Sequence, residues 1–120
     1  MRIIDNNRHM SHVHPTQVGG TVRNNLPFIT RIGPFDVEVG MEGCVLLVQQ
    51  TDKPGIISAV SNVLASNKVN ISYMTVCRTG RGEEAIMAIG VDDEPPAAAV
   101  DAIPKIDGVH EVAVLIENEA

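Results

Sequence analysis

Four runs of apolar or β-branched residues divide the C-terminal two thirds of the chain and predict strands. These runs cover residues 44–50, 69–79, 84–91 and 109–116. Two segments between them carry apolar residues at helical spacing. Residues 54–66 place Ile56, Val60, Val63 and Leu64 on one stripe, and residues 97–103 form a shorter second helix. The predicted order of elements is therefore β-α-β-β-α-β.

This order predicts an α+β fold of the ferredoxin-like type, a four-stranded antiparallel sheet with both helices on one face. In that topology the first and third strands are central, and residues 44–50 and 84–91 are the two most apolar runs. The face of the sheet without helices also carries apolar side chains. A homodimer is the simplest way to cover that face or extend the sheet edge, because one patch serves both subunits.

Residues 18–43 predict a short β-meander that precedes this sheet. Strand patterns at 21–23, 28–32 and 35–39 are separated by turn sequences, and the last pattern alternates strictly between apolar and acidic residues. So few strands do not fold alone. We therefore expect the meander to pack against the rest of the chain or against another chain.

Residues 1–17 are polar without sustained periodicity, which predicts a disordered tail. His9, His12 and His14 have a spacing that could reach a metal ion. However, no cysteine or further carboxylate stands nearby at the spacing of a metal motif. The sequence therefore favours a solvated tail and predicts no metal site.

Charge and composition exclude several classes of function. The 120-residue chain has a formal net charge of −6 and only 2% aromatic residues, so it has neither the basic patch nor the aromatic platform of a nucleic-acid-binding surface. No apolar run approaches the roughly 18 residues of a membrane span, and the first residues lack the apolar core of a secretory signal. Cys44 and Cys77 lie in apolar strand patterns, which favours free thiols in a reducing, intracellular compartment over a disulfide.

Residues 51–55, with the sequence T-D-K-P-G, join the first of these strands to the first helix. Pro54 presets the backbone for a first helical turn, and Gly55 lets another group approach the backbone closely. Free N–H groups at a helix N-terminus can hold an anion such as the carboxylate of a small molecule. Asp52 has two interpretations, which can coexist: a helix cap, or an acceptor for a ligand ammonium group.

This turn, followed after the helix by Val69-Asn70-Ile71 on a β-α-β-β-α-β pattern, resembles the ACT domain. The resemblance covers about residues 44–116 and implies a small regulatory module that binds an amino acid, with a domain spanning residues 44–120. Residues 20–43 also resemble the end of the intervening substrate-binding (ASB) domain of long D-3-phosphoglycerate dehydrogenases, and residues 85–93 and 109–115 resemble the C-terminus of those enzymes. Those are enzymes of L-serine biosynthesis, located in the cytoplasm or, in plants, in the plastid.

The dehydrogenase resemblance implies NAD as the cofactor of the parent enzyme and no cofactor for this chain. No G-x-G-x-x-G sequence follows a strand, so the dinucleotide fingerprint is missing. The catalytic arginine, glutamate and histidine of the family lie in domains that this sequence lacks. No nucleophile–base pair or pair of carboxylates stands out. We therefore expect no catalytic residues in this chain.

By the same resemblance, an effector binds across a dimer interface. The residues that would contact it are Gln50, Asp52, Pro54, Gly55, Ile56 and Asn70. In serine-sensing relatives a histidine stands at the position of Gln50 and an asparagine at that of Asp52, whereas Asn70 matches. The implied effector is a small amino acid, with L-serine as the candidate. Asp52 would accept hydrogen bonds from the ammonium group of the effector. The carboxylate of the effector would rely on N–H groups near Gly55 and Ile56 and on the amide of Asn70.

Two other functions remain open at this point. The residues at positions 50 and 52 favour a structural dimerisation domain without a ligand. A small ferredoxin-like acyl-phosphate hydrolase needs an arginine in the loop after the first strand, and this loop offers only Lys53. Outside the turn, Arg78 is interpreted as a solvated surface charge, and the acidic residues 92–94 as favourable charges at the start of the second helix.

Overall fold

Two sheets and two helices make up the computed structural model, which describes residues 2–5, 18–32, 35–40, 43–78 and 83–116. The larger sheet is antiparallel, with the order β1 (Arg2–Asp5), β8 (Val109–Ile116), β5 (Cys44–Thr51), β7 (Glu84–Val91) and β6 (Ile71–Arg78). The smaller sheet is formed by β2 (Val18–Arg23), β3 (Leu26–Ile32) and β4 (Phe35–Gly40). The helices are α1 (Ile56–Ser66) and α2 (Ala97–Ala102), and a 3₁₀ turn, η1 (Ile103–Lys105), follows α2.

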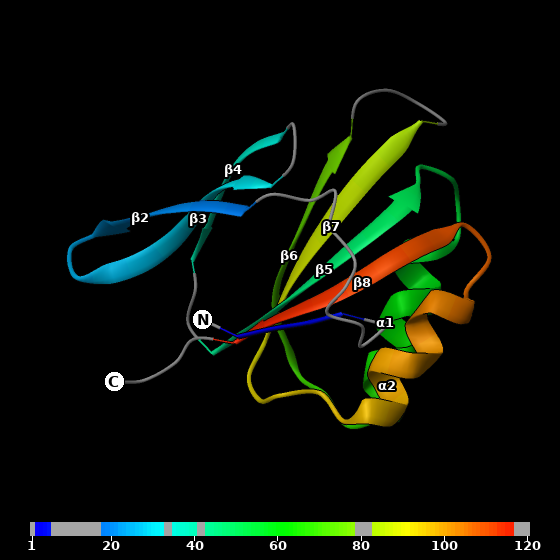
Figure 1. Ribbon diagram of the computed structural model, residues 1–120. Coiled ribbons are helices and arrows are strands. Elements are labelled where there is room, and N and C mark those ends of the chain that lie inside the picture. Colours follow the sequence, from blue (N-terminus) through cyan, green and yellow to red (C-terminus); the bar gives the residue numbers. More distant parts are fainter. Residues whose placement is uncertain (1, 6–17, 33–34, 41–42, 79–82, 117–120) are drawn as a thin grey trace.

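Both helices cover one face of the five-stranded sheet (Figure 1), as the β-α-β-β-α-β order predicts. Helix α1 buries Ile56, Val60 and Leu64. From the sheet, Leu46 and Val48 of β5 point to the same core, together with alternate residues of β7 and β8. Apolar side chains recur about every 3.6 residues along α1 and at every second residue along the strands, so the facing sides together form a single apolar layer.

The opposite face of the sheet is covered by the meander, which lies away from the helices (Figure 1). Ile29 of β3 and Val39 of β4 are each 2% exposed and pack in one cluster with Val45, Leu47 and Leu115. The sequence predicts that a second copy covers this face or extends the sheet edge. The chain covers this face with its own N-terminal strands, which confirms that the meander packs against the rest of the chain.

The element boundaries agree closely with the sequence patterns. The strands expected at 84–91 and 109–116 are β7 and β8, and the central positions of β5 and β7 are confirmed. The turn between β2 and β3 consists of Asn24 and Asn25, both with positive φ, a pattern that favours a tight two-residue hairpin. The expected turns at 33–34 and 79–82 lie outside the described residues.

The first strand is a correction to the expected polar tail. Arg2–Asp5 form β1, which pairs antiparallel with the end of β8, so that Arg2 lies opposite Ile116 and Asp5 opposite Ala113. The four-stranded sheet thus gains a fifth strand, because an exposed strand edge offers unpaired N–H and C=O groups to any extended segment. Residues 6–17, including the three histidines, lie outside the described residues.

Tyr73 of β6 connects the two sheets. Its hydroxyl donates a hydrogen bond to the carbonyl oxygen of Gly40 at the end of β4, with an O–O distance of 2.9 Å. Its ring lies directly over Gly90 of β7, where a Cβ atom would come within 2.1 Å of the ring. Burial raises the pKa of the Tyr73 phenol to about 12. A glycine at position 90 is therefore needed for the ring to reach the meander.

This arrangement predicts an alkaline loss of stability that belongs to Tyr73. The folded-state pKa lies above the ordinary value of 10.0, so the contribution is complete below pH 10 and is lost as pH rises through about 12. Because Tyr73 is the only tyrosine in the chain, phenolate absorbance reports on it alone. We expect a midpoint near 12 in native protein and near 10 in urea, and a native midpoint near 10 would contradict the assignment. Tyr73→Phe should cost about 1 kcal/mol at neutral pH and abolish this alkaline dependence.

Candidate effector-binding site

The loop between β5 and α1 brings the predicted turn residues to one end of the sheet. Gly55 is the N-cap of α1 and has a φ of +92°, a conformation that glycine adopts readily. The N–H of Ala59 donates to the carbonyl of Gly55 at 2.9 Å, which closes the first helical turn. Among the described residues, no side chain forms a cap hydrogen bond at the start of this helix. The interpretation of Asp52 as a helix cap is therefore wrong.

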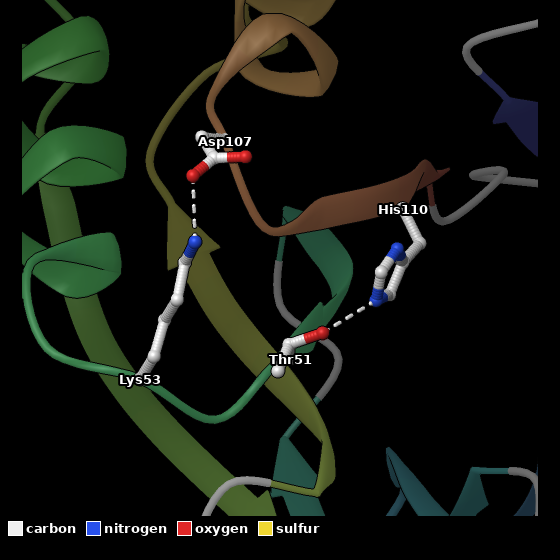
Figure 2. Close-up of polar contacts among 4 residues, drawn as sticks. All are labelled: Thr51, Lys53, Asp107 and His110. Atoms are coloured by element: carbon white, nitrogen blue, oxygen red, sulfur yellow. Dashed lines mark hydrogen bonds and ion pairs between the residues drawn. The ribbon is translucent and has the colours of Figure 1, made fainter.

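Three contacts hold this loop against the turn that leads into β8. The N–H of Thr51 donates to the carbonyl oxygen of Gly108 at 2.8 Å. Figure 2 shows the two side-chain contacts, Thr51 Oγ1 with His110 Nε2 at 2.9 Å and Lys53 Nζ with Asp107 Oδ2 at 2.7 Å. The hydrogen bond and positive charge of Lys53 lower the pKa of the Asp107 carboxyl. The loop thus has a defined position, and Lys53 forms an exposed ion pair with Asp107.

Asp52 is fixed from the other side, by β6 and by the residue that precedes β7. Its N–H donates to the carbonyl oxygen of Glu83 at 2.6 Å. Its side chain is only 22% exposed, and Oδ2 accepts a hydrogen bond from Arg78 Nη1 at 3.1 Å. Arg78 is therefore an exposed surface charge, as interpreted from the sequence, but it also has a partner in Asp52.

The strand register explains how Arg78 reaches Asp52. Arg78 of β6 lies opposite Ala85 of β7, and Ala85 in turn lies opposite Gln50 of β5. The small side chain of Ala85 leaves room for the long arginine side chain to cross the intervening strand. The contact between Arg78 and Asp52 follows from the register of β6 on β7. The sequence pattern alone does not determine that register.

Gln50 is the only buried polar side chain among the described residues, with 2% of its surface exposed. Its Oε1 atom has no hydrogen-bond partner in the part of the chain that the structure describes. Gln50 lies two residues before Asp52, near the end of β5. A buried acceptor without a donor is unfavourable by about 1–3 kcal/mol, so this position is suited to a polar group beyond those of the described residues.

The remaining predicted site residues separate into two groups. Pro54 and Gly55 are exposed beside Asp52, whereas Ile56 is 2% exposed and belongs to the core. Asn70 lies elsewhere, just before β6, and its Nδ2 donates to Asp92 Oδ2 at 2.7 Å. Asp92 is therefore a partner of Asn70 and not a first-turn acid of α2, which begins at Ala97.

The structure does not bring Asn70 and Asp52 together within one chain. The carbonyl of Asn70 accepts from the N–H of Asp92 just after β7, and Asp52 bonds to Glu83 just before β7. β7 has eight residues, so the two positions are separated by roughly 25 Å of extended strand.

Other candidate chemistry is sparse in the described residues. Within them, no group of three or more His, Cys, Asp or Glu side chains is placed to hold a metal ion. Cys44 and Cys77 are not joined by a disulfide, as predicted, and burial raises the pKa of the Cys77 thiol. No helix in the described ranges has the length and apolar character needed to span a membrane.

Comparison with known proteins identifies the family. The family model of the ACT domain matches residues 45–108, more than half of the chain. The chain belongs to the ACT domain family. The matched segment runs from β5 to the turn before β8 and includes every residue of the predicted effector site. The described strands and helices of this segment have the ferredoxin-like arrangement expected from the sequence.

The relatives of this chain include proteins named as two kinds of enzyme. The chain is 39% identical over 99 residues to D-3-phosphoglycerate dehydrogenase 3, chloroplastic, of Arabidopsis thaliana, covering 82% of this chain and 17% of the relative. It is 30% identical over 96 residues to D-3-phosphoglycerate dehydrogenase of Methanocaldococcus jannaschii, covering 80% and 18%. It is also 30% identical over 89 residues to the probable L-serine dehydratase, beta chain, of Bacillus subtilis, covering 74% and 40%.

The chain thus spans about a sixth of the length of these dehydrogenases and two fifths of the dehydratase chain. Residues 45–120 make up less than two thirds of this chain. The alignment with the Arabidopsis thaliana relative covers 82% of this chain, so it includes part of the segment that precedes the ACT domain. The division of that segment into residues 1–17 and 18–43 stays a prediction.

The docking of the loop on Gly108 predicts a sensitive position. Gly108 has a φ of +98°, and a Cβ atom there would lie 2.6 Å from Lys53 Cε and 2.8 Å from Ile56 Cδ1. Gly108→Ala should lower the free energy of unfolding by about 1–3 kcal/mol, measured by urea denaturation. Lys53→Ala, which removes only an exposed ion pair that solvent screens, should cost clearly less than Gly108→Ala. A Gly108→Ala protein as stable as the Lys53→Ala protein would contradict the docked loop.

Proposed function

We propose that this chain is a regulatory module that binds a small amino acid at the β5–α1 loop of a homodimer. The observation that carries the proposal is the Asp52 carboxylate, held beside the uncapped N-terminus of α1 by a loop with fixed contacts on both sides. An anionic acceptor and free helical N–H groups in one place match the two ends of an amino acid. The chain itself is assigned no catalytic step and no NAD site.

A second copy of the chain accounts for the distance between Asp52 and Asn70. β6 is an edge strand of the larger sheet, with Val76 37% exposed along it. Two copies related by a twofold axis can pair through β6 in antiparallel fashion. The start of one β6 then meets the end of the other, which brings Asn70 of the second copy to Arg78 and Asp52 of the first. Each dimer therefore contains two sites, and each site draws on both chains.

In this site Asp52 accepts hydrogen bonds from the ligand ammonium group. N–H groups near Gly55 and Ile56 and the amide of Asn70 from the second copy donate to the ligand. Gln50 precedes Asp52 by two residues, and its buried Oε1 atom has no partner among the described residues, so a ligand donor or a bound water that reaches it satisfies a buried group.

L-serine is the first candidate effector. An ACT-related segment of similar length occurs in two dehydrogenases and in a protein named as a probable L-serine dehydratase, although these enzymes catalyse different reactions. A shared regulatory ligand is a simple reason for such a distribution. Binding across the dimer favours one arrangement of the two chains, and linkage transmits that preference to catalytic domains joined to the module.

A structural dimerisation domain without a ligand is the second candidate function. The observation in its favour is the Asp52–Arg78 ion pair, because the carboxylate already has a partner within the chain. Under this alternative β6 still pairs with a second copy, but amino acids have no effect on stability or assembly.

The first test is calorimetric titration of the full chain with L-serine, glycine and L-alanine, together with sedimentation to establish the dimer. We expect at least one amino acid to bind and to stabilise the protein by about 2.7 kcal/mol at 100 times its Kd. Asp52→Ala and Asn70→Ala should each abolish binding. Asn62→Ala, which removes an exposed asparagine from α1, serves as the matched control and should bind normally.

Mixing the two inactive variants tests the shared site. In a heterodimer of Asp52→Ala and Asn70→Ala chains, one site has both residues intact and the other has lost both. An equimolar mixture should therefore regain binding at one site per heterodimer. If the single variants lose binding and the mixture does not recover it, the site does not span two chains. If none of the three amino acids binds the unmodified chain, the dimerisation alternative is preferred.

A further inference from the structure

Arg78 has spare hydrogen-bonding capacity next to Asp52. Its guanidinium carries five N–H donors, and among the described residues it makes one hydrogen bond, from Nη1 to Asp52 Oδ2 at 3.1 Å. The Arg78 side chain is 53% exposed, compared with 22% for Asp52. The guanidinium therefore reaches solvent while its partner carboxylate is largely covered.

Lys53, the cation of the β5–α1 loop, does not contact Asp52 and has a different partner. Lys53 Nζ is 2.7 Å from Asp107 Oδ2, and Figure 2 shows its side chain extending away from the end of β5 toward the turn before β8. Arg78 is the cation that contacts Asp52 within the described residues. A planar guanidinium also binds a carboxylate through two parallel N–H groups, which an ammonium group cannot do.

The two members of the pair differ in how firmly they are held. The backbone of Asp52 bonds to Glu83, and the neighbouring residues Thr51 and Lys53 are each tied to the turn before β8. The Arg78 side chain has only Asp52 as a described side-chain partner and ends in solvent. Asp52 therefore provides a fixed acceptor, and the guanidinium can shift by rotation about its side-chain bonds.

We propose that Arg78 binds the carboxylate of the effector, so that the Asp52–Arg78 pair recognises the zwitterion of a free α-amino acid. This inference rests on the proposed function and specifies the chemical class of ligand at that site. In the empty protein the guanidinium neutralises Asp52. On binding, the ligand ammonium takes its place on Asp52, and the freed N–H groups of Arg78 turn to the ligand carboxylate. One ion pair is exchanged for two.

This exchange makes both ligand charges necessary. A ligand that has an ammonium group but no carboxylate must displace Arg78 from Asp52 and offers the guanidinium nothing in return. A ligand with a blocked amine leaves the original pair intact and has no contact with Asp52. The site therefore discriminates against amines and against N-acylated amino acids, including a modified N-terminus or an amino acid within a peptide chain.

The test compares three probes on the full chain by calorimetry: L-serine, ethanolamine, which lacks the carboxylate, and N-acetyl-L-serine, which lacks the ammonium charge. Each is titrated into the unmodified protein, Arg78→Gln, Arg78→Lys and Arg23→Ala. Arg23 is the matched control because it is an exposed arginine paired with a carboxylate, Glu38, on the meander. Sedimentation of each variant reports on the dimer.

We expect the unmodified protein and Arg23→Ala to bind L-serine. Both proteins should bind ethanolamine and N-acetyl-L-serine much more weakly than L-serine. Arg78→Gln should weaken L-serine roughly ten- to a hundredfold, the range for one charge-assisted hydrogen-bonded pair. The same variant should bind ethanolamine at least as well as the unmodified protein does, because Asp52 no longer has a competitor. Arg78→Lys should recover part of the L-serine affinity, since it keeps the charge without the planar donors.

Two results would overturn the inference in distinguishable ways. If the unmodified protein binds L-serine and Arg78→Gln binds it equally well, Arg78 does not contact the carboxylate, while the proposed function survives. The same conclusion follows if Arg78→Gln weakens L-serine and ethanolamine by the same factor, because the arginine then acts only on the fold or the dimer. If the unmodified protein binds none of the probes, the proposed function and this inference both fail.

Discussion

The structure depends on the burial of its two central strands from both sides. In β5, residues 44–48 are all at most 5% exposed, with alternate side chains directed to the helices and to the meander. A shift of one residue in the register would exchange these two sets of side chains, so the pairing of β5 with β7 and β8 is strongly specified. The loop that follows β5 inherits this fixed position, and with it Asp52 and Gln50.

The hydrophobic pattern was sufficient to predict most of this framework. Continuous apolar runs identified β5 and β7 as central strands, because only strands buried on both faces dispense with polar alternation. The spacing of Ile56, Val60 and Leu64 identified the buried face of α1. These features follow from local sequence and the period of each element, which is why they could be predicted without knowledge of tertiary contacts.

The pattern could not predict contacts between segments distant in the sequence. The assignment of Asn70 and the loop at 51–55 to one site came from family resemblance, and their separation within one chain is seen only from the strand order. The pairing of Arg78 with Asp52 depends on the register of β6, β7 and β5 together. β1 was missed for a related reason, since the pairing of Arg2–Asp5 with β8 is set by a free edge and not by any apolar period.

Strand β7 connects the two halves of the proposed site mechanically. One end follows Glu83, whose carbonyl holds the backbone of Asp52, and the other end precedes Asp92, which holds Asn70 through both backbone and side chain. β7 lies between β5 and β6 and is buried along nearly its whole length. In the proposed symmetric dimer each β7 runs from one proposed site to the other, so a single buried strand links the two sites.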